Sequence, residues 1–380
     1  MNMLKFDFKN KTHVIVMALF LLMLPLMLQG VGNFWVRVAD MALLYVLLAL
    51  GLNIVVGFAG LLDLGFVAFF AIGAYMYGLM ASPHLFETFP AIARMFPEGL
   101  HTPIWIIVPA AALLAGAFGV LLGAPTLKLR GDYLAIVTLG FGEIIRVFMN
   151  NLDHPVNITN GPKGLILIDP MNIFGYSFGK GIEIFGYKIG SLVMYYYLFM
   201  ALVVISVIIC HRLELSRIGR AWMAIREDEI AAKAMGINTR NLKLLAFGMG
   251  ATFGGVSGSM FAAFQGFISP ESFSLMESVM IVAMITLGGL GHLPGVIIGA
   301  LLLSTLPEVL RWVSGVLDLQ AVTGGRVDAS ILRQLLIALA MIIIMLVRPR
   351  GLWPSPDHGK SLENSANAAK AASTKEGAAA

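Results

Sequence analysis

The sequence contains few charged residues. Asp, Glu, Lys and Arg make up 13% of its 380 residues, about half the share that is usual in soluble domains. Apolar residues make up 58%, and the mean hydropathy is +0.84. A soluble protein of this length would have too few polar residues to cover its surface. The composition therefore excludes a cytosolic enzyme, a disordered chain and a fibrous protein, and predicts a polytopic membrane protein.

Cysteine and the motifs of common enzymes are also scarce. Cys210 is the single cysteine, so the chain has neither an internal disulfide nor a cysteine-based metal cluster. The string nearest to a Walker A motif, around Lys180, has the wrong spacing and no Ser or Thr after the lysine. HExxH, GxSxG and EF-hand strings are absent from the sequence. We therefore assign no catalytic residue, metal or cofactor, and the net charge of +4 is too small to indicate nucleic acid as a partner.

Long apolar stretches dominate the chain instead. A membrane-spanning helix needs about 20 mostly apolar residues. Ten segments approach that requirement, namely 13–30, 38–56, 58–81, 104–126, 133–150, 191–210, 244–267, 276–291, 295–312 and 331–347. We therefore expect an all-α polytopic membrane protein with about ten transmembrane helices. No small-residue cleavage site follows the first segment, so we interpret it as a retained helix rather than a signal peptide.

The positive charges are distributed unevenly between the loops. If the N-terminus lies inside, the inside segments hold 17 Lys and Arg residues and the outside loops hold 6. This bias predicts that both termini are cytoplasmic. Residues 1–350 would then form the transmembrane domain, with an outside loop at 151–190 and an inside loop at 211–243. Residues 351–380 would form a disordered tail, and alternating apolar stretches such as 182–185 predict a short strand pair in the outside loop.

Glycines recur four residues apart within several predicted spans, at Gly119/Gly123, Gly250/Gly254/Gly258 and Gly291/Gly295/Gly299. This spacing lets helix backbones approach closely in lipid, so it predicts tight helix packing. An alternative interpretation is that these surfaces slide or rock during transport.

Ionisable residues inside spans are costly and therefore candidates for function. Six qualify in this sequence, namely Asp63, Glu143, Arg146, Glu277, Glu308 and Arg311. Within each of the two Glu–Arg pairs the residues are three positions apart, so the two charges are expected to neutralise each other on one helix face. Asp63 lies in a glycine-interrupted stretch, where a broken helix would expose backbone polar groups to a solute. A position at the cytoplasmic interface is the alternative for this residue.

The inside loop contains the string GRAWMAIREDEIAAKAMGI. Its run of strong helix formers predicts one helix over 221–235, which Gly236 would end, and Asn238 or Thr239 would cap the next helix. The charges at 226–229 surround this helix, so it cannot lie flat in lipid. It is interpreted either as a helix that docks in a groove of another cytoplasmic protein or as a solvated loop helix.

Part of this loop, EIAAKAMG at 229–236, resembles the coupling motif of bacterial ABC importer permeases. The longer string IGRAWMAIREDEIAAKAMGIN resembles the branched-chain amino acid permease family, and its M-type subunit in particular. The similarity continues through LGLNIVVGFAGLLDLGFVAFFAIGAY, GDYLAIVTLGFGEIIR, QGFISPESFSLMESVMIVAMITLGGLG and PGVIIGALLLSTLPEVLR. It covers most of residues 40–350 and implies an ABC importer permease fold in the bacterial inner membrane.

The resemblance also implies partners. Such a permease pairs with a second, related permease in a heterodimer, two cytoplasmic ABC ATPases dock on its coupling helices, and a periplasmic binding protein delivers leucine, isoleucine or valine. ATP would be hydrolysed by the partner subunits, so this chain is not expected to be an enzyme. The residues implied to contact the ATPase are Arg226, Glu227, Asp228, Glu229, Ala231, Ala232 and Gly236.

The composition suits this cargo, because a branched aliphatic side chain needs an apolar path and its zwitterion needs a few polar groups. The polar residues predicted to line that path are Asn53, Asp63, Ser257, Ser259 and Thr286. Two alternative functions remain. One is a urea or short-amide ABC permease, and the other is an ion-coupled secondary carrier, for which Asp63 would be the candidate ion site.

Overall fold

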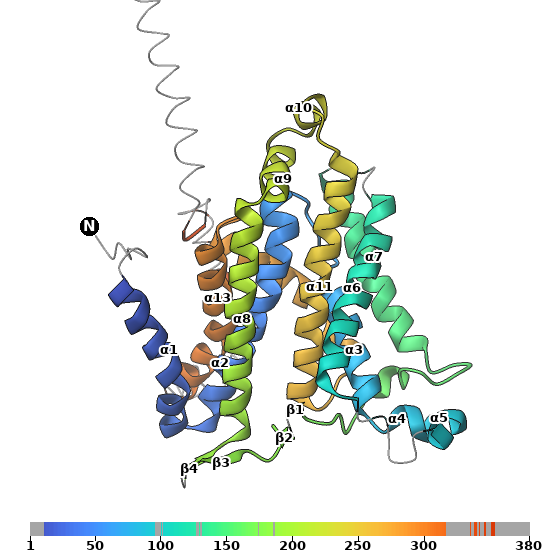
Figure 1. Cartoon of the computed structure of the whole chain (residues 1–380), viewed down its shortest axis with the longest axis vertical. Helices are drawn as coiled ribbons and strands as arrows, with labels where there is room; N and C mark the ends of the chain where they lie inside the picture. The colour runs from blue at the N-terminus through green and yellow to red at the C-terminus, as the bar shows by residue number, and fades with distance from the viewer. Residues whose placement is uncertain are drawn as a thin grey trace, which may run out of the picture.

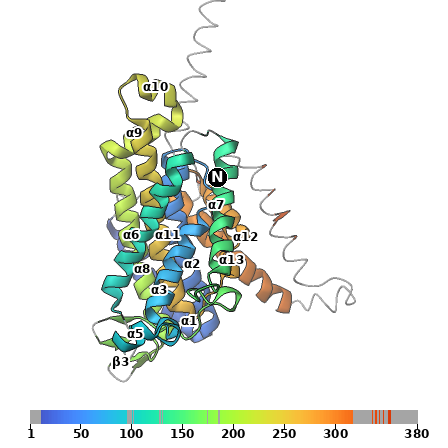
Figure 2. The same ribbon diagram turned by 90° about the vertical axis from the view of Figure 1, so that its right-hand side faces the viewer.

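The computed structural model is a bundle of long helices with small elements at both ends (Figures 1 and 2). The described residues are 11–95, 100, 102–126, 129, 131–173, 175–184, 187–316, 335, 338–339, 342, 346 and 351–353. Helices α9 (Arg217–Glu227) and α10 (Glu229–Ala234) project from one end of the bundle. The short helices α4 (His84–Thr88) and α5 (Pro90–Met95) and all four described strands lie at the opposite end.

The remaining elements follow the predicted segments closely. The longer helices are α1 (Lys11–Val31), α2 (Asn33–Asn53), α3 (Val67–Ala81), α6 (Ile104–Thr126), α7 (Asp132–Asn151), α8 (Ser191–Leu215), α11 (Thr239–Gln265), α12 (Leu275–Gly288) and α13 (Leu293–Val316). A π-helical turn, η1 (Ile54–Phe58), extends α2, and two 3₁₀ turns are η2 (Gly161–Lys163) and η3 (Pro270–Phe273).

Six helical stretches in the described part of the chain are long and apolar enough to cross a membrane. They are Asn33–Phe58, Ile104–Thr126, Ser191–Leu215, Thr239–Gln265, Pro270–Gly288 and Leu293–Trp312. Phe20–Gly30 and Val67–Ala81 are apolar but shorter. The molecule is therefore a mostly helical, polytopic membrane protein, while the expected count of about ten spans and the placement of the termini stay predictions. The expected tenth span, 331–347, lies almost entirely outside the described residues, as does the predicted tail except for 351–353.

Helix α11 occupies the centre of the bundle and packs against α2, α3 and α6. Glycines make these contacts close. A Cβ atom added at Gly258 would overlap the carbonyl oxygen of Phe70 on α3, and one added at Gly119 on α6 would meet Ala251 at 2.5 Å. The predicted role of the four-residue glycine spacing in tight packing is therefore confirmed at these contacts.

The structure corrects the predicted boundary between the second and third spans. The third span was expected to begin at residue 58, but α3 begins at Val67. The preceding segment leaves the helix after η1, with Gly60 at φ 70°. Inside the break, the Leu64 N–H donates to the Thr138 hydroxyl at 3.0 Å and the Gly65 N–H donates to Asp63 at 2.8 Å. These bonds satisfy backbone groups that a continuous helix would have paired.

The loop at 151–190 contains two small antiparallel hairpins, which confirms the predicted short strand pair. Strand β1 (Asn172–Ile173) pairs with β2 (Tyr176–Ser177), and β3 (Ile182–Ile184) pairs with β4 (Tyr187–Ile189). Leu165 forms an isolated bridge with Ile268, which fixes this loop to the chain that follows α11.

Both predicted Glu–Arg pairs are present. Arg146 lies 3.0 Å from Glu143 and also 3.2 Å from Glu271, and Arg311 lies 3.0 Å from Glu308. The local neutralisation expected from their three-residue spacing is therefore confirmed.

Replacing Gly258 with alanine should separate α11 from α3, because the new methyl group has no space beside the Phe70 carbonyl. Overpacking of this kind costs about 1–3 kcal/mol, so the thermal unfolding midpoint in detergent should fall. Gly140→Ala is the matched control, since no atom lies within 4 Å of its added Cβ. An unchanged midpoint in Gly258→Ala would contradict the close contact.

Candidate functional site

The site predicted from the inside loop is a projecting unit of two short helices, α9 and α10, which we call the α9–α10 lobe (Figure 1). The expectation of one helix over 221–235 is wrong. Asp228 adopts an extended conformation between the two helices, and its carboxylate accepts hydrogen bonds from Ile230 and Ala231 at 2.8 and 3.1 Å. Asp228 therefore caps α10 instead of continuing α9, because its short side chain satisfies the free N–H groups at the helix start.

The other predicted helix ends are confirmed. Gly236 follows α10 with φ 83°, a conformation that glycine adopts without steric cost. The side chain of Asn238 accepts a hydrogen bond from the Asn241 N–H at 3.2 Å and so caps α11. At the start of α9, the Ser216 hydroxyl accepts from Gly219 at 3.1 Å.

Trp222 fixes the lobe to the bundle. Its side chain is fully buried, and its indole N–H donates to the Leu242 carbonyl in the first turn of α11 at 2.7 Å. Ile225 and Ala232 are buried beside it in the lobe. Burial of a tryptophan and its neighbours stabilises this arrangement by several kcal/mol, about 25 cal/mol per Å² of apolar surface. The α9 part of the lobe is therefore packed on the bundle, while its docking to another protein stays a prediction.

An ion pair between α10 and α11 provides a second attachment of the lobe to the bundle. Glu229 lies 2.8 Å from Lys243, whose side chain is 6% exposed, and 3.2 Å from Lys233. Burial opposes ionisation of Glu229, but hydrogen bonds from Lys243 and Lys233 outweigh it and hold the pKa of this carboxyl below its usual range. The ionised form of Glu229 therefore stabilises the junction.

Arg226 provides a third attachment, from the end of α9 to the helix break. Its guanidinium donates to the carbonyl oxygen of Gly57 in η1. An added Cβ at Gly60 would meet the Arg226 side chain at 2.8 Å, and one at Gly291 would meet its guanidinium at 2.7 Å. The Asn53 side chain accepts from the Gly291 N–H at 3.0 Å. Arg226 therefore joins the lobe to the break after α2 and to the turn between α12 and α13.

The seven predicted coupling residues have different environments. Arg226, Glu229 and Ala232 face the protein, whereas Glu227, Asp228, Ala231 and Gly236 are exposed. Two further exposed residues of this lobe are apolar, since Ile230 is 67% exposed and Met235 is 83% exposed. The lobe thus exposes two large apolar side chains among charged residues of both signs, a composition that suits a protein interface.

The predicted path residues do not gather in one cavity of the described chain. Asn53 contacts the α12–α13 turn, and Asp63 is buried within the break. Ser257 is buried and donates to the Phe253 carbonyl at 2.8 Å, Ser259 donates to Gly73 across the α3–α11 contact at 3.2 Å, and Thr286 donates to Ala283 at 3.0 Å. Their role in the path stays a prediction.

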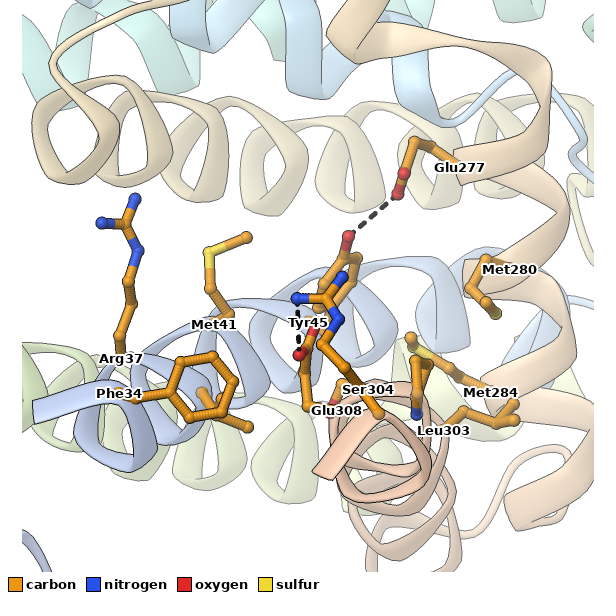
Figure 3. Close-up of a pocket in the computed structure, with 13 residues that line it drawn as sticks. Phe34, Arg37, Met41, Tyr45, Glu277, Met280, Met284, Leu303, Ser304 and Glu308 are labelled. Atoms are coloured by element: carbon orange, nitrogen blue, oxygen red, sulfur yellow. Dashed lines mark hydrogen bonds and ion pairs between the residues drawn. The ribbon is translucent and has the colours of Figure 1, made fainter. Parts of the chain in front are cut away.

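The sequence analysis missed several residues of these sites. Trp222 and Lys243 were identifiable only from their burial, because each resembles an ordinary interfacial residue in the sequence. Asp40 is fully buried in α2, and no hydrogen bond reaches its carboxylate from the described residues. Its position inside the expected span 38–56 could have identified it as a candidate, but it was not among the six chosen. Arg37, one turn earlier, lines a cavity between α2, α12 and α13 (Figure 3).

Arg226→Ala should loosen the lobe without unfolding the bundle. A hydrogen bond from a charged group contributes about 1.5–3 kcal/mol, so backbone amides of α9 and of residues 54–60 should exchange hydrogen roughly 10- to 100-fold faster. Arg220→Ala is the control, because the Arg220 guanidinium is exposed and donates to Leu215 within the same part of the chain. Equal exchange in both variants would refute the attachment.

Stability of the α10–α11 junction should fall in acid. The lowered pKa of Glu229 means that its stabilisation is complete above the pKa of the unfolded chain, about 4.3, and is lost as the pH falls through the folded-state value. At pH 7, Glu229→Gln should lower the melting midpoint by about 2–4 °C relative to the wild type, as a loss of about 1 kcal/mol would. At about pH 3.5, below the unfolded-chain pKa, the two melting midpoints should lie closer together. Glu214→Gln, which alters a half-buried carboxyl beside His211, is the control. A difference between Glu229→Gln and the wild type that does not change with pH would contradict this assignment.

Comparisons with known proteins agree with this architecture. The family described as branched-chain amino acid transport system / permease component matches residues 34–346. No solved structure gives a significant match. The chain is 37% identical over 370 residues to the high-affinity branched-chain amino acid transport system permease protein LivM of Escherichia coli K12, covering 94% of this chain and 78% of LivM.

LivM of Salmonella typhimurium is 39% identical over 331 residues, which cover 84% of this chain and 70% of that protein. LivH of Escherichia coli K12 is a more distant relative, 26% identical over 322 residues that cover 82% of this chain and 92% of LivH. Both the family match and the identity to LivM extend over most of the helical bundle, so this chain belongs to the family of branched-chain amino acid transport permease components.

Proposed function

We propose that this chain is the membrane-spanning permease of an ATP-driven importer that moves leucine, isoleucine and valine. The observation that carries the proposal is the α9–α10 lobe, which has exposed apolar side chains and three separate attachments to the helix bundle. Membership of the permease family and the names of the LivM and LivH relatives support the cargo class.

The proposed assembly contains a second, related permease, two ABC ATPases on the cytoplasmic side and a periplasmic binding protein. Similarity of this chain to both LivM and LivH supports a pair of related permeases. The lobe would lie in the cytoplasm with both termini, consistent with the seven Lys and Arg residues at 211–243. The hairpins and the loop at 268–275 would then lie on the periplasmic side of the inner membrane and face the binding protein.

The proposed contact with the ATPase centres on α10. Ile230, Ala231 and Met235 would fill an apolar groove of the partner, and Glu227 and Asp228 would lie at its polar edge. Apolar anchors in the middle and charges at the rim are the arrangement from which stable protein interfaces derive most of their energy.

The three attachments of the lobe would transmit ATPase motion to the spans. Displacement of α10 would pull on α11 through the Glu229–Lys243 ion pair, and displacement of α9 would pull on α11 through Trp222. Displacement of α9 pulls on the helix break through Arg226. Packed elements move as rigid bodies around breaks, so the three attachments together would change the tilt of α11 relative to α2 and α3.

Reconstitution of the chain in proteoliposomes with its partner permease, ATPases and binding protein tests this function. We expect leucine uptake that requires every component and ATP, and that valine and isoleucine inhibit while urea does not. Ile230→Asp should reduce uptake and ATPase association at least tenfold, because about 1.5–3 kcal/mol of apolar burial is lost. Ile230→Leu should retain both.

Uptake by the chain alone, abolished when the ion gradient is dissipated, would instead establish a secondary carrier. Uptake that urea inhibits and leucine does not would establish the short-amide alternative. Full coupling in Ile230→Asp would remove α10 from the ATPase contact.

A further inference from the structure

A cavity of about 350 Å³ lies between α2, α12 and α13, apart from the lobe and its attachments (Figure 3). This volume lies within the range of sites that hold small molecules, about 300–1,000 Å³. Its walls come from α2 and from the consecutive helices α12 and α13, which are far from α2 in the sequence, so the cavity is a product of the tertiary fold.

The cavity extends from one end of the bundle toward its middle. It begins at Phe34 in the first turn of α2 and reaches Tyr45, which is about 16 Å farther along a helix with a rise of 1.5 Å per residue. The whole stretch Asn33–Phe58 is about 39 Å long by the same measure. The ring of Trp312 on α13 lies 6.3 Å from that of Trp35, so the last turns of α13 flank the same mouth.

The cavity concentrates charge in a chain that has little of it. Arg37, Glu277, Glu308 and Arg311 all line it, which gives two positive and two negative groups. Arg37 and Arg311 belong to the helix ends near the mouth, whereas Glu277 lies deeper and accepts a hydrogen bond from the Tyr45 hydroxyl at 2.9 Å. Arg311 pairs with Glu308 at 3.0 Å and Arg37 donates to Gln265. Glu277 is the ionisable group at depth, which is costly in a membrane and therefore a candidate for function.

The rest of the wall is apolar and adaptable. Met41, Met280, Met284 and Leu303 surround the charged groups (Figure 3). Methionine side chains are flexible and polarizable, so they fit aliphatic groups of several shapes. A wall of this kind would accept leucine, isoleucine and valine side chains without distinguishing them sharply.

We propose that this cavity is a binding site for a zwitterionic α-amino acid with an aliphatic side chain, a station on the path through the membrane. The ammonium group of the solute binds Glu277, the carboxylate points back toward the arginines at the mouth, and the side chain packs on the methionines. Opposite charges in fixed positions offset the loss of hydration of both solute groups. This inference rests on the proposed cargo.

The electrostatic pattern distinguishes this solute from a lipid. A phospholipid would place acyl chains along the helices, where Glu277 and Glu308 would face hydrocarbon. An amino acid instead matches both signs of charge and the apolar wall at once, and it is small enough for the cavity.

A cysteine-protection experiment in the assembled transporter tests the site. Cys210 is buried, so a cysteine placed at Ser304, which lines the cavity, should be the reactive thiol toward a small maleimide. Leucine at ten times its Kd should slow labelling of Ser304→Cys about tenfold. Neither 4-methylpentanoate, which lacks the ammonium group, nor 3-methylbutylamine, which lacks the carboxylate, should protect at the same concentration.

Adding Glu277→Gln to Ser304→Cys should abolish protection. Adding Glu143→Gln, which alters an ion pair with Arg146 outside the cavity, should leave protection intact. Val309→Cys, on the same helix outside the cavity lining, should label at a rate that leucine does not change. Absence of leucine protection in a complex that still takes up leucine would overturn the site and leave the proposed function standing. A thiol at 304 that reacts in the isolated chain but not in the complex would show that the second permease fills the cavity, which also overturns it.

Discussion

Backbone hydrogen bonding inside a membrane is the constraint on which this structure depends. Lipid offers no donors or acceptors, so a chain that leaves helical geometry there must satisfy its peptide groups within the protein. Between α2 and α3 the chain does leave helical geometry, and the groups that meet this requirement come from distant parts of the sequence. Thr138 binds Leu64 from α7, and Arg226 binds the Gly57 carbonyl from the lobe. The break is therefore also the point at which separate elements are connected.

Close contacts between helices at glycines also hold the bundle together. Because lipid supplies no hydrophobic force between helices, close backbone approach and dispersion hold α11 against its neighbours. Added Cβ atoms at these glycines would overlap atoms of the neighbouring helix, so the contacts leave no room for larger side chains.

Local signals in the sequence predicted local features well. Gly236 ended α10 as expected, and the Glu–Arg pairs formed because three-residue spacing alone determines that contact. Features that depend on distant residues were not predictable in this way. The ion pair of Glu229 with Lys243, the burial of Trp222 and the cavity between α2, α12 and α13 all require knowledge of which helices are neighbours. The separation of α9 from α10 was missed because Asp228 lies in a run of strong helix formers, and its capping bonds prevailed over their propensity.

The contact of Arg226 with Gly60 and Gly291 limits which substitutions are tolerated at these three positions. The arginine side chain occupies the space that a Cβ at Gly60 or Gly291 would need. A larger residue at either glycine would displace the guanidinium from the Gly57 carbonyl. The positive φ angles of Gly60 and Gly291, 70° and 78°, independently favour glycine at both positions. Arg226 lies more than 160 residues after Gly60 and more than 60 residues before Gly291 in the sequence, yet its side chain lies against both glycines. A substitution at any one of the three therefore alters the space available to the other two.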